Sequence, residues 1–288
     1  MSRKKISIAI PASVISDTPH LREKTSKIGL IGRAAAIFGV GEIVIYRDEP
    51  NRDQRFEANL IATLLNYMET PQYLRKRLFK LKPELKYAGI LPPLRTPHHP
   101  LGRKITDLKV GEYREGVTIA TSKVGTLVDV GVEKPAIIPE TRLQPGKRVT
   151  VRITYVNNKM LTAILADPKE VPVYWGYKVT VLDGYLADLL KNRSYDLKIA
   201  TSRRGRIFNE VMETMALKWK HSKTPLILFG APTRGLYEIA EQEGFKLDEN
   251  VDFTVNMIPG QCTETVRTEE AILASLAIFN IFFGFSLS

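Results

Sequence analysis

The chain is poor in the residues that build metal centres and disulfides. Its 288 residues include one cysteine, Cys262, and four histidines. A single cysteine excludes a disulfide scaffold and a thiolate zinc site, and it is typical of a reducing compartment such as the cytoplasm. The histidines lack the HExxH spacing of a metal site, so the sequence predicts no metal; they are His20, His98, His99 and His221.

Common nucleotide-binding patterns are also missing. No segment matches the P-loop pattern GxxxxGK[ST]. Gly39-Val-Gly41 lacks the third glycine of the dinucleotide fingerprint and follows a predicted helix instead of a strand. The N-terminal segment MSRKKISIAIPAS has a short, alternating apolar stretch, which favours a first strand over a signal peptide.

Basic residues outnumber acidic residues only in the first part of the chain. Residues 1–170 contain 29 basic and 17 acidic side chains, a net charge of +12. Residues 171–288 contain 13 and 14, a net charge of −1. The excess of +11 over the whole chain therefore lies in the first part, where its field attracts phosphate backbones or anionic membranes.

One long segment lacks charge altogether. The last eighteen residues, 271–288, contain no charged side chain and reach the length of a marginal membrane span. Ser275, Asn280 and Gly284 make the segment less apolar. An apolar helix is also what a buried or dimer-interface position requires, so we expect no membrane contact, with a C-terminal anchor as the alternative.

Strands and helices alternate at both ends of the chain, which predicts an α/β fold with a parallel sheet. Apolar alternation predicts strands, and apolar residues at helical spacing predict helices. The predicted strands are 5–16, 42–46, 178–183, 196–200, 225–230 and 252–258. The predicted helices are 21–38, 51–68, a short basic helix through Lys80, 184–191, 207–218, 236–243 and one that begins near Val266.

The middle of the chain has a different pattern. A proline-rich boundary at 90–104 is followed by short alternating strands at 113–120, 125–132, 147–156 and 159–166. Turn signals at Gly125, Pro145-Gly146 and Asn157-Asn158 separate them. The pattern GxVTxA…GTLVDVGV resembles the S1-like OB-fold, with another small barrel as the alternative. We therefore predict an inserted OB-like domain at 93–170, between the α/β parts 1–92 and 171–288.

Three consecutive strands near the C-terminus each lead into a glycine-bearing loop. The loops are TSRRG at 201–205, FGAPTRG at 229–235 and NMIPGQCTETVRTEEA at 256–271. Ligands of open α/β sheets bind at the carboxyl ends of strands, where glycine lets the backbone approach closely. The three loops are expected to converge on one small molecule, although each alone reads equally well as an ordinary turn.

These motifs resemble the SPOUT superfamily, and most closely its archaeal and eukaryotic RNA methyltransferases with an inserted OB-fold. The resemblance rests on IPGQCTETVRTEEAILASLAIFN, FGAPTRGL and REKTSKIGLIGRAAAIF. It implies a trefoil knot in the C-terminal part, a homodimer formed through the SPOUT domain, and S-adenosylmethionine bound by the knot loops. The implied cofactor-binding residues are Thr201, Phe229, Gly230, Ala231, Asn256, Ile258, Pro259, Gly260, Thr263 and Thr265.

The resemblance also implies catalytic residues. A positioned arginine would stabilise a uridine N3 that has lost its proton. Arg22, in the REKT motif, and Arg204 are the first choices, ahead of Arg33, Arg203 and Arg234, and Glu264 would act as a base or orient an arginine. Each of these is alternatively a solvated surface charge. Cys262 stands where the family usually has glycine, and this departure leaves an inactive RNA-binding protein open.

The RNA-binding surface is predicted from charge. Six positive charges occur between Arg75 and Lys86, interleaved with aromatic residues, and the barrel adds further arginines. A solvated helix face is the alternative. The predicted RNA-binding residues are Arg75, Lys76, Arg77, Lys80, Lys82, Arg114, Arg148 and Arg152.

Composition and resemblance together predict a cytoplasmic, homodimeric, S-adenosylmethionine-dependent RNA methyltransferase. By analogy its target is a base of ribosomal RNA, with uridine N3 as the preferred atom. The alternative is a catalytically inactive RNA-binding or ribosome-assembly factor with the same fold.

Overall fold

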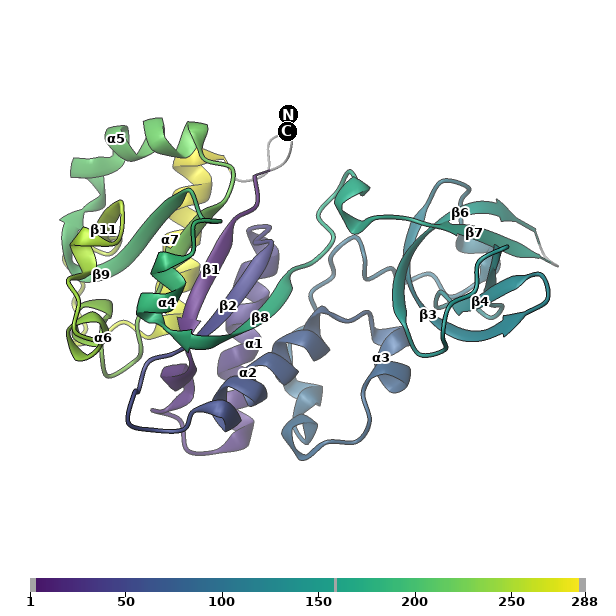
Figure 1. Cartoon of the computed structure of the whole chain (residues 1–288), viewed down its shortest axis with the longest axis horizontal. Helices are drawn as coiled ribbons and strands as arrows, with labels where there is room; N and C mark the ends of the chain where they lie inside the picture. Colours follow the sequence, from purple (N-terminus) through teal and green to yellow (C-terminus); the bar gives the residue numbers. More distant parts are fainter. Residues whose placement is uncertain (1–3, 158–159, 285–288) are drawn as a thin grey trace. The chain divides into compact units, whose positions relative to one another are not determined.

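The computed structural model describes residues 4–157 and 160–284, which form two compact units (Figure 1). The sheet unit consists of the described residues within Met1–Met68, Glu84–Pro93 and Tyr177–Ser288. The barrel unit consists of those within Glu69–Pro83 and Leu94–Gly176. The segment Glu69–Pro83, which the sequence analysis grouped with the N-terminal α/β part, thus belongs with the barrel.

The sheet unit is an α/β structure with six strands, all parallel, in the order β11-β9-β10-β1-β2-β8. The strands are β1 (Ser7–Pro11), β2 (Glu42–Arg47), β8 (Lys178–Tyr185), β9 (Leu197–Ile207), β10 (Pro225–Leu228) and β11 (Phe253–Asn256). The helices are α1 (Leu21–Ile37), α2 (Arg55–Glu69), α4 (Leu186–Lys191), α5 (Phe208–His221), α6 (Leu236–Gln242) and α7 (Thr268–Phe283). The predicted α/β class is confirmed.

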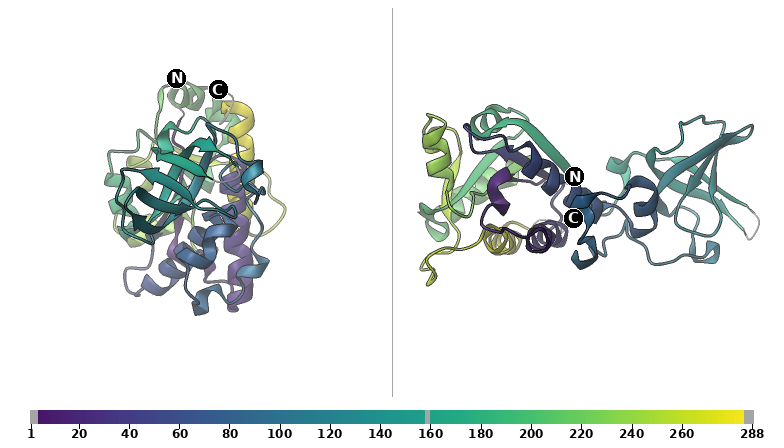
Figure 2. Two further views of the ribbon diagram at one scale, coloured as in Figure 1. Left: turned by 90° about the vertical axis from the view of Figure 1, so that its right-hand side faces the viewer. Right: turned by 90° about the horizontal axis from the view of Figure 1, so that it is seen from below.

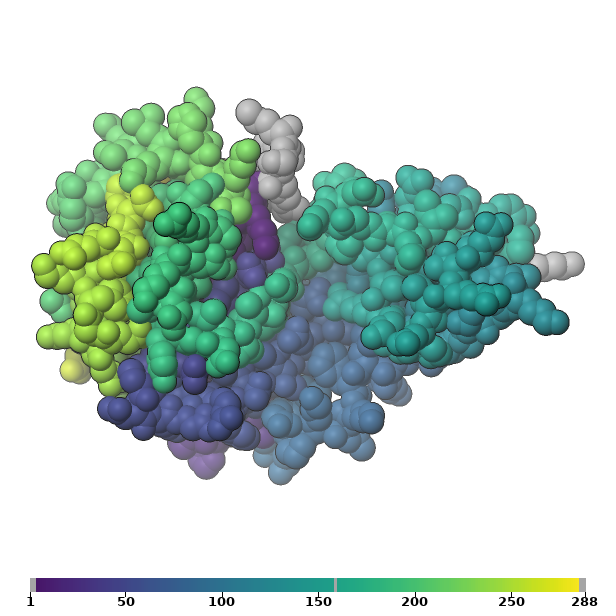
Figure 3. Space-filling model, viewed as in Figure 1, coloured from purple at the N-terminus to yellow at the C-terminus, as the bar shows by residue number. Residues whose placement is uncertain are grey.

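Helices cover both faces of this sheet, as continuous apolar strands require. The central strands β1 and β10 are buried along their whole length. On one face, Leu189 of α4 and Ile239 of α6 share a core cluster with Val44 and Leu228 of the sheet. Helices α1 and α7 pack side by side, as the view from below shows (Figure 2). Segments of α4, α6 and β11 form much of the surface of this unit in the space-filling view (Figure 3).

Strand β9 differs from its prediction. Residues 201–205 were expected to form a loop, but β9 continues through Ile207. A bulge after Thr254 shifts the register of β11, so that Val255 pairs with Arg206. Gly205 makes this close approach possible, because a Cβ there would lie 2.6 Å from the backbone of Thr254. Gly205, which indicated a loop in the sequence, therefore allows the paired strands β9 and β11 to approach closely.

The barrel unit contains a closed five-stranded barrel in the order β3-β4-β5-β7-β6. Its strands are β3 (Tyr113–Ser122), β4 (Gly125–Asp129), β5 (Ala136–Pro139), β6 (Arg148–Val156) and β7 (Leu161–Leu165). Four strands were predicted here and β5 was not, because its four residues follow Pro135, end on Pro139 and are too few to show alternation. Asn158, part of a predicted turn, lies outside the described residues.

The basic segment after α2 is a short helix attached to the barrel. Helix α3 (Gln72–Leu78) ends before the predicted Lys80, with an extended residue at Phe79. The Tyr73 hydroxyl donates to the Glu115 carbonyl at 2.9 Å, and the Arg77 guanidinium pairs with Asp129 at 2.6 Å. The basic residues beyond the helix, Lys80 and Lys82, are exposed.

The apolar C-terminal segment forms a packed helix. Ile272, Leu276 and Phe279 of α7 are buried, and the Phe279 ring stacks on Trp219 of α5 at 5.9 Å. Within residues 4–157 and 160–284, no helix combines the length and the apolar character that a membrane span needs. The last four residues of the segment, 285–288, lie outside the described part of the chain.

A buried carboxylate, Glu69, joins the pieces of the barrel unit. It forms a two-pronged ion pair with Arg148 of β6, at 2.6 and 3.0 Å, and lies 3.1 Å from the Nε2 atom of His98. Burial alone would raise the pKa of Glu69, but hydrogen bonds from His98 and Arg148 outweigh it and hold the pKa at about 2. Burial and the neighbouring His98 lower the pKa of His99 to about 4.

These pKa shifts predict acid sensitivity. His99 binds its proton more weakly when folded, so stability falls as the pH drops from 6.5 towards about 4. Glu69 keeps its charge when folded, so stability falls again between 4.5 and about 2. Glu69→Gln should reduce the second loss and cost about 3 kcal/mol at neutral pH, because a buried ion pair loses one partner.

Urea unfolding across this pH range measures both effects. Glu170→Gln, at an exposed carboxylate of the same unit, is the matched control and should leave the stability profile unchanged. An acid limb of Glu69→Gln that superimposes on that of the unmodified protein would contradict the assignment.

Candidate functional site

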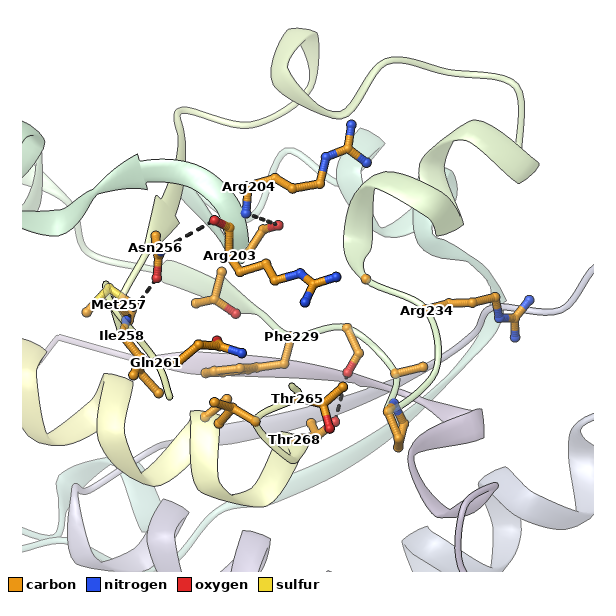
Figure 4. Close-up of a pocket in the computed structure, with 18 of the residues that line it drawn as sticks. Arg203, Arg204, Phe229, Arg234, Asn256, Met257, Ile258, Gln261, Thr265 and Thr268 are labelled. Carbon is orange, nitrogen blue, oxygen red and sulfur yellow. Dashed lines mark hydrogen bonds between the residues drawn. The ribbon is translucent and has the colours of Figure 1, made fainter. Parts of the chain in front are cut away.

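The three predicted C-terminal segments line one cavity of about 290 Å³, which lies along residues 201–204 of β9 and at the carboxyl ends of β10 and β11 (Figure 4). The start of α7 forms the remaining wall. The lining residues that the sequence analysis named as site residues are Thr201, Arg204, Phe229, Gly230, Ala231, Asn256, Ile258, Glu264 and Thr265. Carboxyl ends of parallel strands are where α/β folds bind small molecules, so this cavity is the candidate site.

The loop after β10 forms the floor of the cavity. Phe229 is buried, and its carbonyl accepts a hydrogen bond from the Tyr46 hydroxyl at 2.9 Å. Burial raises the pKa of Tyr46 well above its usual range, so the phenol stays protonated and remains a donor. The Gly230 carbonyl accepts from the Thr268 hydroxyl at 3.0 Å, which ties this loop to α7.

The same loop is anchored to the sheet by an ion pair. The Arg234 guanidinium contacts Asp48 at 3.1 Å and Glu49 at 2.6 Å, both at the end of β2. Asp48 is fully buried, and its carboxylate also accepts hydrogen bonds from Ser13 and Gln54. A buried carboxylate needs such a full set of donors, and here it fixes three loops together.

The loop after β11 forms the opposite wall. The Asn256 side chain donates to the Arg203 carbonyl at 3.1 Å and accepts from the Ile258 amide at 3.0 Å. Gly260 has a φ of +73°, a conformation that favours glycine. Cys262 has no positive φ and is exposed outside the cavity, so its replacement of a family glycine introduces no backbone strain.

Two neighbouring arginines at the rim have different surroundings. Arg204 pairs with Glu238 at 3.0 Å, and its guanidinium lies 4.5 Å from the centre of the Tyr237 ring. Arg203 donates to the Glu264 carbonyl at 3.1 Å. Its guanidinium extends over the cavity, whereas that of Arg204 turns away (Figure 4). From the sequence, Arg204 was preferred to Arg203 as the catalytic arginine.

One lining side chain has an unsatisfied hydrogen-bonding group. Ser275 of α7 is 1% exposed, and its hydroxyl has no hydrogen-bond partner among the described residues. Ser275 follows Thr268 and Ala271, which also line the cavity, at helical spacing. In the sequence, Ser275 was noted only as a polar residue in an apolar segment. Its helical spacing from Thr268 and Ala271 is the signal that would have identified it as a lining residue. A buried hydroxyl without a partner costs free energy, so the position suits a ligand hydrogen bond.

Several predicted site residues do not line the cavity. Pro259, Gly260 and Thr263 lie in the loop after β11 but outside the lining set. Arg22 is exposed in the first turn of α1 and is also outside it. Within the described ranges, no group of three or more His, Cys, Asp or Glu side chains is arranged to hold a metal ion.

The predicted RNA-binding residues fall into two groups. Arg114 is 2% exposed and pairs with Glu112, and Arg148 is held by Glu69 and Glu115. These two arginines are engaged by carboxylates inside the barrel unit, and their role as RNA contacts stays a prediction. Arg75 is half-buried and donates to the Thr70 carbonyl. The exposed members are Lys76, Arg77, Lys80, Lys82 and Arg152.

Comparison with known proteins identifies the family of the chain. Residues 5–279 match a family model described as "Putative RNA methyltransferase". A human protein named 28S rRNA (uridine-N(3))-methyltransferase is 33% identical, over 94% of this chain and 77% of its own length. An uncharacterized protein of Halobacterium salinarum is 32% identical, over 94% of this chain and 96% of its own length.

Among solved structures, one described as "Structural insights into the 2-OH methylation of C/U34 on tRNA" aligns with 96% of this chain and 90% of its own. The sequence identity is 13% and the TM-score 0.39, so the assignment rests on the family model and the relatives. Both favour an enzyme over the alternative of an inactive assembly factor. The chain belongs to the RNA methyltransferase family that this model describes.

Proposed function

We propose that this enzyme transfers a methyl group from S-adenosylmethionine to N3 of a uridine in ribosomal RNA. The observation that carries the proposal is the cavity lined by residues 201–204 of β9 and by the segments that follow β10 and β11. The base and the atom follow the human relative, whose name specifies uridine N3 of 28S rRNA. The predicted cytoplasmic location belongs to the same proposal.

The cavity fits the proposed cofactor in size and chemistry. Its volume of about 290 Å³ lies at the lower end of small-molecule sites. Phe229, Met257 and Ile258 supply an apolar wall for the adenine ring, and the unpartnered Ser275 hydroxyl supplies a buried hydrogen-bonding group. When bound, S-adenosylmethionine supplies an electrophilic methyl group on a sulfonium.

The residues of the chain then act mainly by positioning and by charge. Uridine N3 must lose its proton before it can accept a methyl group. The Arg203 guanidinium over the cavity stabilises the resulting anion, and the Glu264 carboxylate at the rim accepts the proton. Arg204 has a positioning role at the rim, where it pairs with Glu238 and packs over the Tyr237 ring.

Two features of the fold also belong to this proposal. The trefoil knot follows from the family resemblance, with the segments 229–235 and 256–271 as its loops. The inserted barrel is proposed as an OB-fold, which is supported by its strand order and by the parallel pairing of β5 with β7.

The proposed homodimer uses the exposed apolar residues of the paired helices α1 and α7. Leu30 and Ile37 of α1 are both 53% exposed, and Leu273 and Ile281 of α7 are exposed as well. Apolar side chains gathered on neighbouring helices are typical of a protein interface. By the family resemblance, Arg22 at the start of α1 faces the cavity of the partner.

Leu30→Glu should convert the dimer into a monomer, because it introduces a charge into the apolar interface. Sedimentation velocity measures the change. Leu217→Glu, at an exposed leucine of α5, is the matched control and should remain dimeric. A Leu30→Glu protein that still sediments as a dimer would place the interface elsewhere.

Gly230→Val should weaken S-adenosylmethionine binding at least about tenfold. A Cβ at Gly230 would lie 3.0 Å from the Cα of Gly235 and 3.1 Å from the Arg234 carbonyl, so the floor of the cavity must move. Isothermal titration calorimetry measures the affinity. At Gly89 a Cβ would meet nothing within 4 Å, so Gly89→Val is the control; equal affinities for the two variants would refute this site.

Methyl transfer itself is tested with radiolabelled S-adenosylmethionine and an unmodified transcript of large-subunit ribosomal RNA. Digestion of the product should yield N3-methyluridine, identified by mass spectrometry against a standard. Arg203→Gln should lower kcat by roughly 100-fold while the affinity for S-adenosylmethionine stays the same. Tight RNA binding without any transfer would favour the assembly-factor alternative.

A further inference from the structure

The positive charge of the chain is concentrated in the barrel unit. Its segments, Glu69–Pro83 and Leu94–Gly176, contain 18 basic and 9 acidic residues, a net charge of +9. The remaining segments contain 24 and 22, a net charge of +2. Because most of the net charge lies in the barrel unit, this unit attracts a phosphate backbone more strongly than the sheet unit does.

One face of the barrel carries a row of side chains suited to unpaired bases. Tyr113 of β3 lies opposite Arg152 of β6, and Arg152 lies opposite Ile164 of β7. Directly opposite residues of antiparallel strands point to the same face. Because Val151 and Ile153, the neighbours of Arg152, fill the barrel core, this row points outward. Ile164 is 42% exposed, and Arg152 is exposed as well.

Trp175 extends this row beyond Tyr113. The two rings lie 6.2 Å apart, edge to face. The indole N–H of Trp175 donates to the Glu115 carboxylate at 2.6 Å, which fixes the ring in place. Both rings are half-buried, so part of each is accessible. A ring that is already fixed loses little side-chain freedom when a base stacks on it.

The charge of Arg152 is available to a ligand. Within the described part of the chain, its guanidinium makes no ion pair and no side-chain hydrogen bond. Its cross-strand neighbours, Tyr113 and Ile164, are uncharged. Arg148 of the same strand is neutralised by Glu69 and Glu115. Unlike Arg148, Arg152 therefore keeps its charge free for a ligand.

We infer that Tyr113, Arg152, Ile164 and Trp175, the aromatic row, bind an unpaired segment of the RNA substrate. Bases stack on the two rings and on Ile164, and Arg152 contacts a phosphate or a base face. Duplex RNA keeps its bases inside the helix and offers mainly phosphates and ribose hydroxyls, so the row selects single strands. The choice of RNA as ligand rests on the proposed function.

A protein with a single tryptophan tests this directly. The chain contains two tryptophans, and Trp219→Phe leaves only Trp175. The probe is a single-stranded pyrimidine-rich RNA of about twelve nucleotides, compared with the same strand in a duplex. We expect the single strand to quench Trp175 emission, and Tyr113→Leu, which retains apolar bulk, to weaken binding roughly tenfold. The duplex should bind more weakly and quench less.

Two controls separate stacking from charge. Trp175→Phe leaves the buried Trp219 of the sheet unit, whose emission should not respond to RNA. Replacing Lys76, Lys80 and Lys82 together with glutamine should lower the salt dependence of binding but preserve the quenching of Trp175. A loss of quenching in this triple variant at saturating RNA would count against the row.

The inference is overturned if saturating single-stranded RNA leaves Trp175 emission unchanged and Tyr113→Leu binds within about twofold of the parent. Stronger binding of the duplex would also overturn it. Titration of the same variants with S-adenosylmethionine keeps the two proposals apart. A protein that quenches with RNA but neither binds the cofactor nor transfers methyl retains the aromatic row and loses the proposed function.

Discussion

The parallel arrangement of the six-stranded sheet is the constraint on which the site depends. Because all strands run the same way, the carboxyl ends of β10 and β11 lie at one edge, and the loops that follow them meet residues 201–204 of β9 there. Strand order thus brings the three segments of the cavity together. Local sequence then shapes each segment. Gly205 allows the backbone of β11 to approach closely, and Gly230 allows the close approach of Gly235. Asn256 stabilises the turn after β11.

Two buried carboxylates hold irregular segments that no strand or helix would fix. Asp48 joins the ends of β1 and β2 to the β10 loop through Ser13 and Arg234. Within the barrel unit, Glu69 joins Arg148 of β6 to His98. In both cases burial makes the charge costly unless every lone pair is used, so the donors are locked in one arrangement. The floor of the cavity consequently depends on Asp48, which follows β2 and is far from the floor in sequence.

The α/β rhythm and the inserted barrel follow from periodicity, and the three glycine-bearing segments that line the cavity were found as short motifs. The individual residues named within those segments came from the family resemblance. The sequence did not predict β5, whose four residues show no periodicity, nor the extension of β9 through 201–207. It assigned Arg114 and Arg148 to RNA because a positive charge reads the same whether it is free or paired. Ser275 was not predicted as a lining residue with an unsatisfied hydroxyl, because its lack of a partner is a property of packing, which no local pattern records.

The separation of charge between the units has a consequence for how the proposed reaction is organised. The sheet unit, with a net charge of +2, contains a cavity whose floor is apolar and whose arginines are mostly paired. The barrel unit, with +9, contains exposed lysines and a face of fixed rings. Counterion release makes phosphate contacts strongly salt-dependent. Under the proposed function, salt should therefore weaken RNA binding by the barrel unit more than cofactor binding in the cavity of the sheet unit.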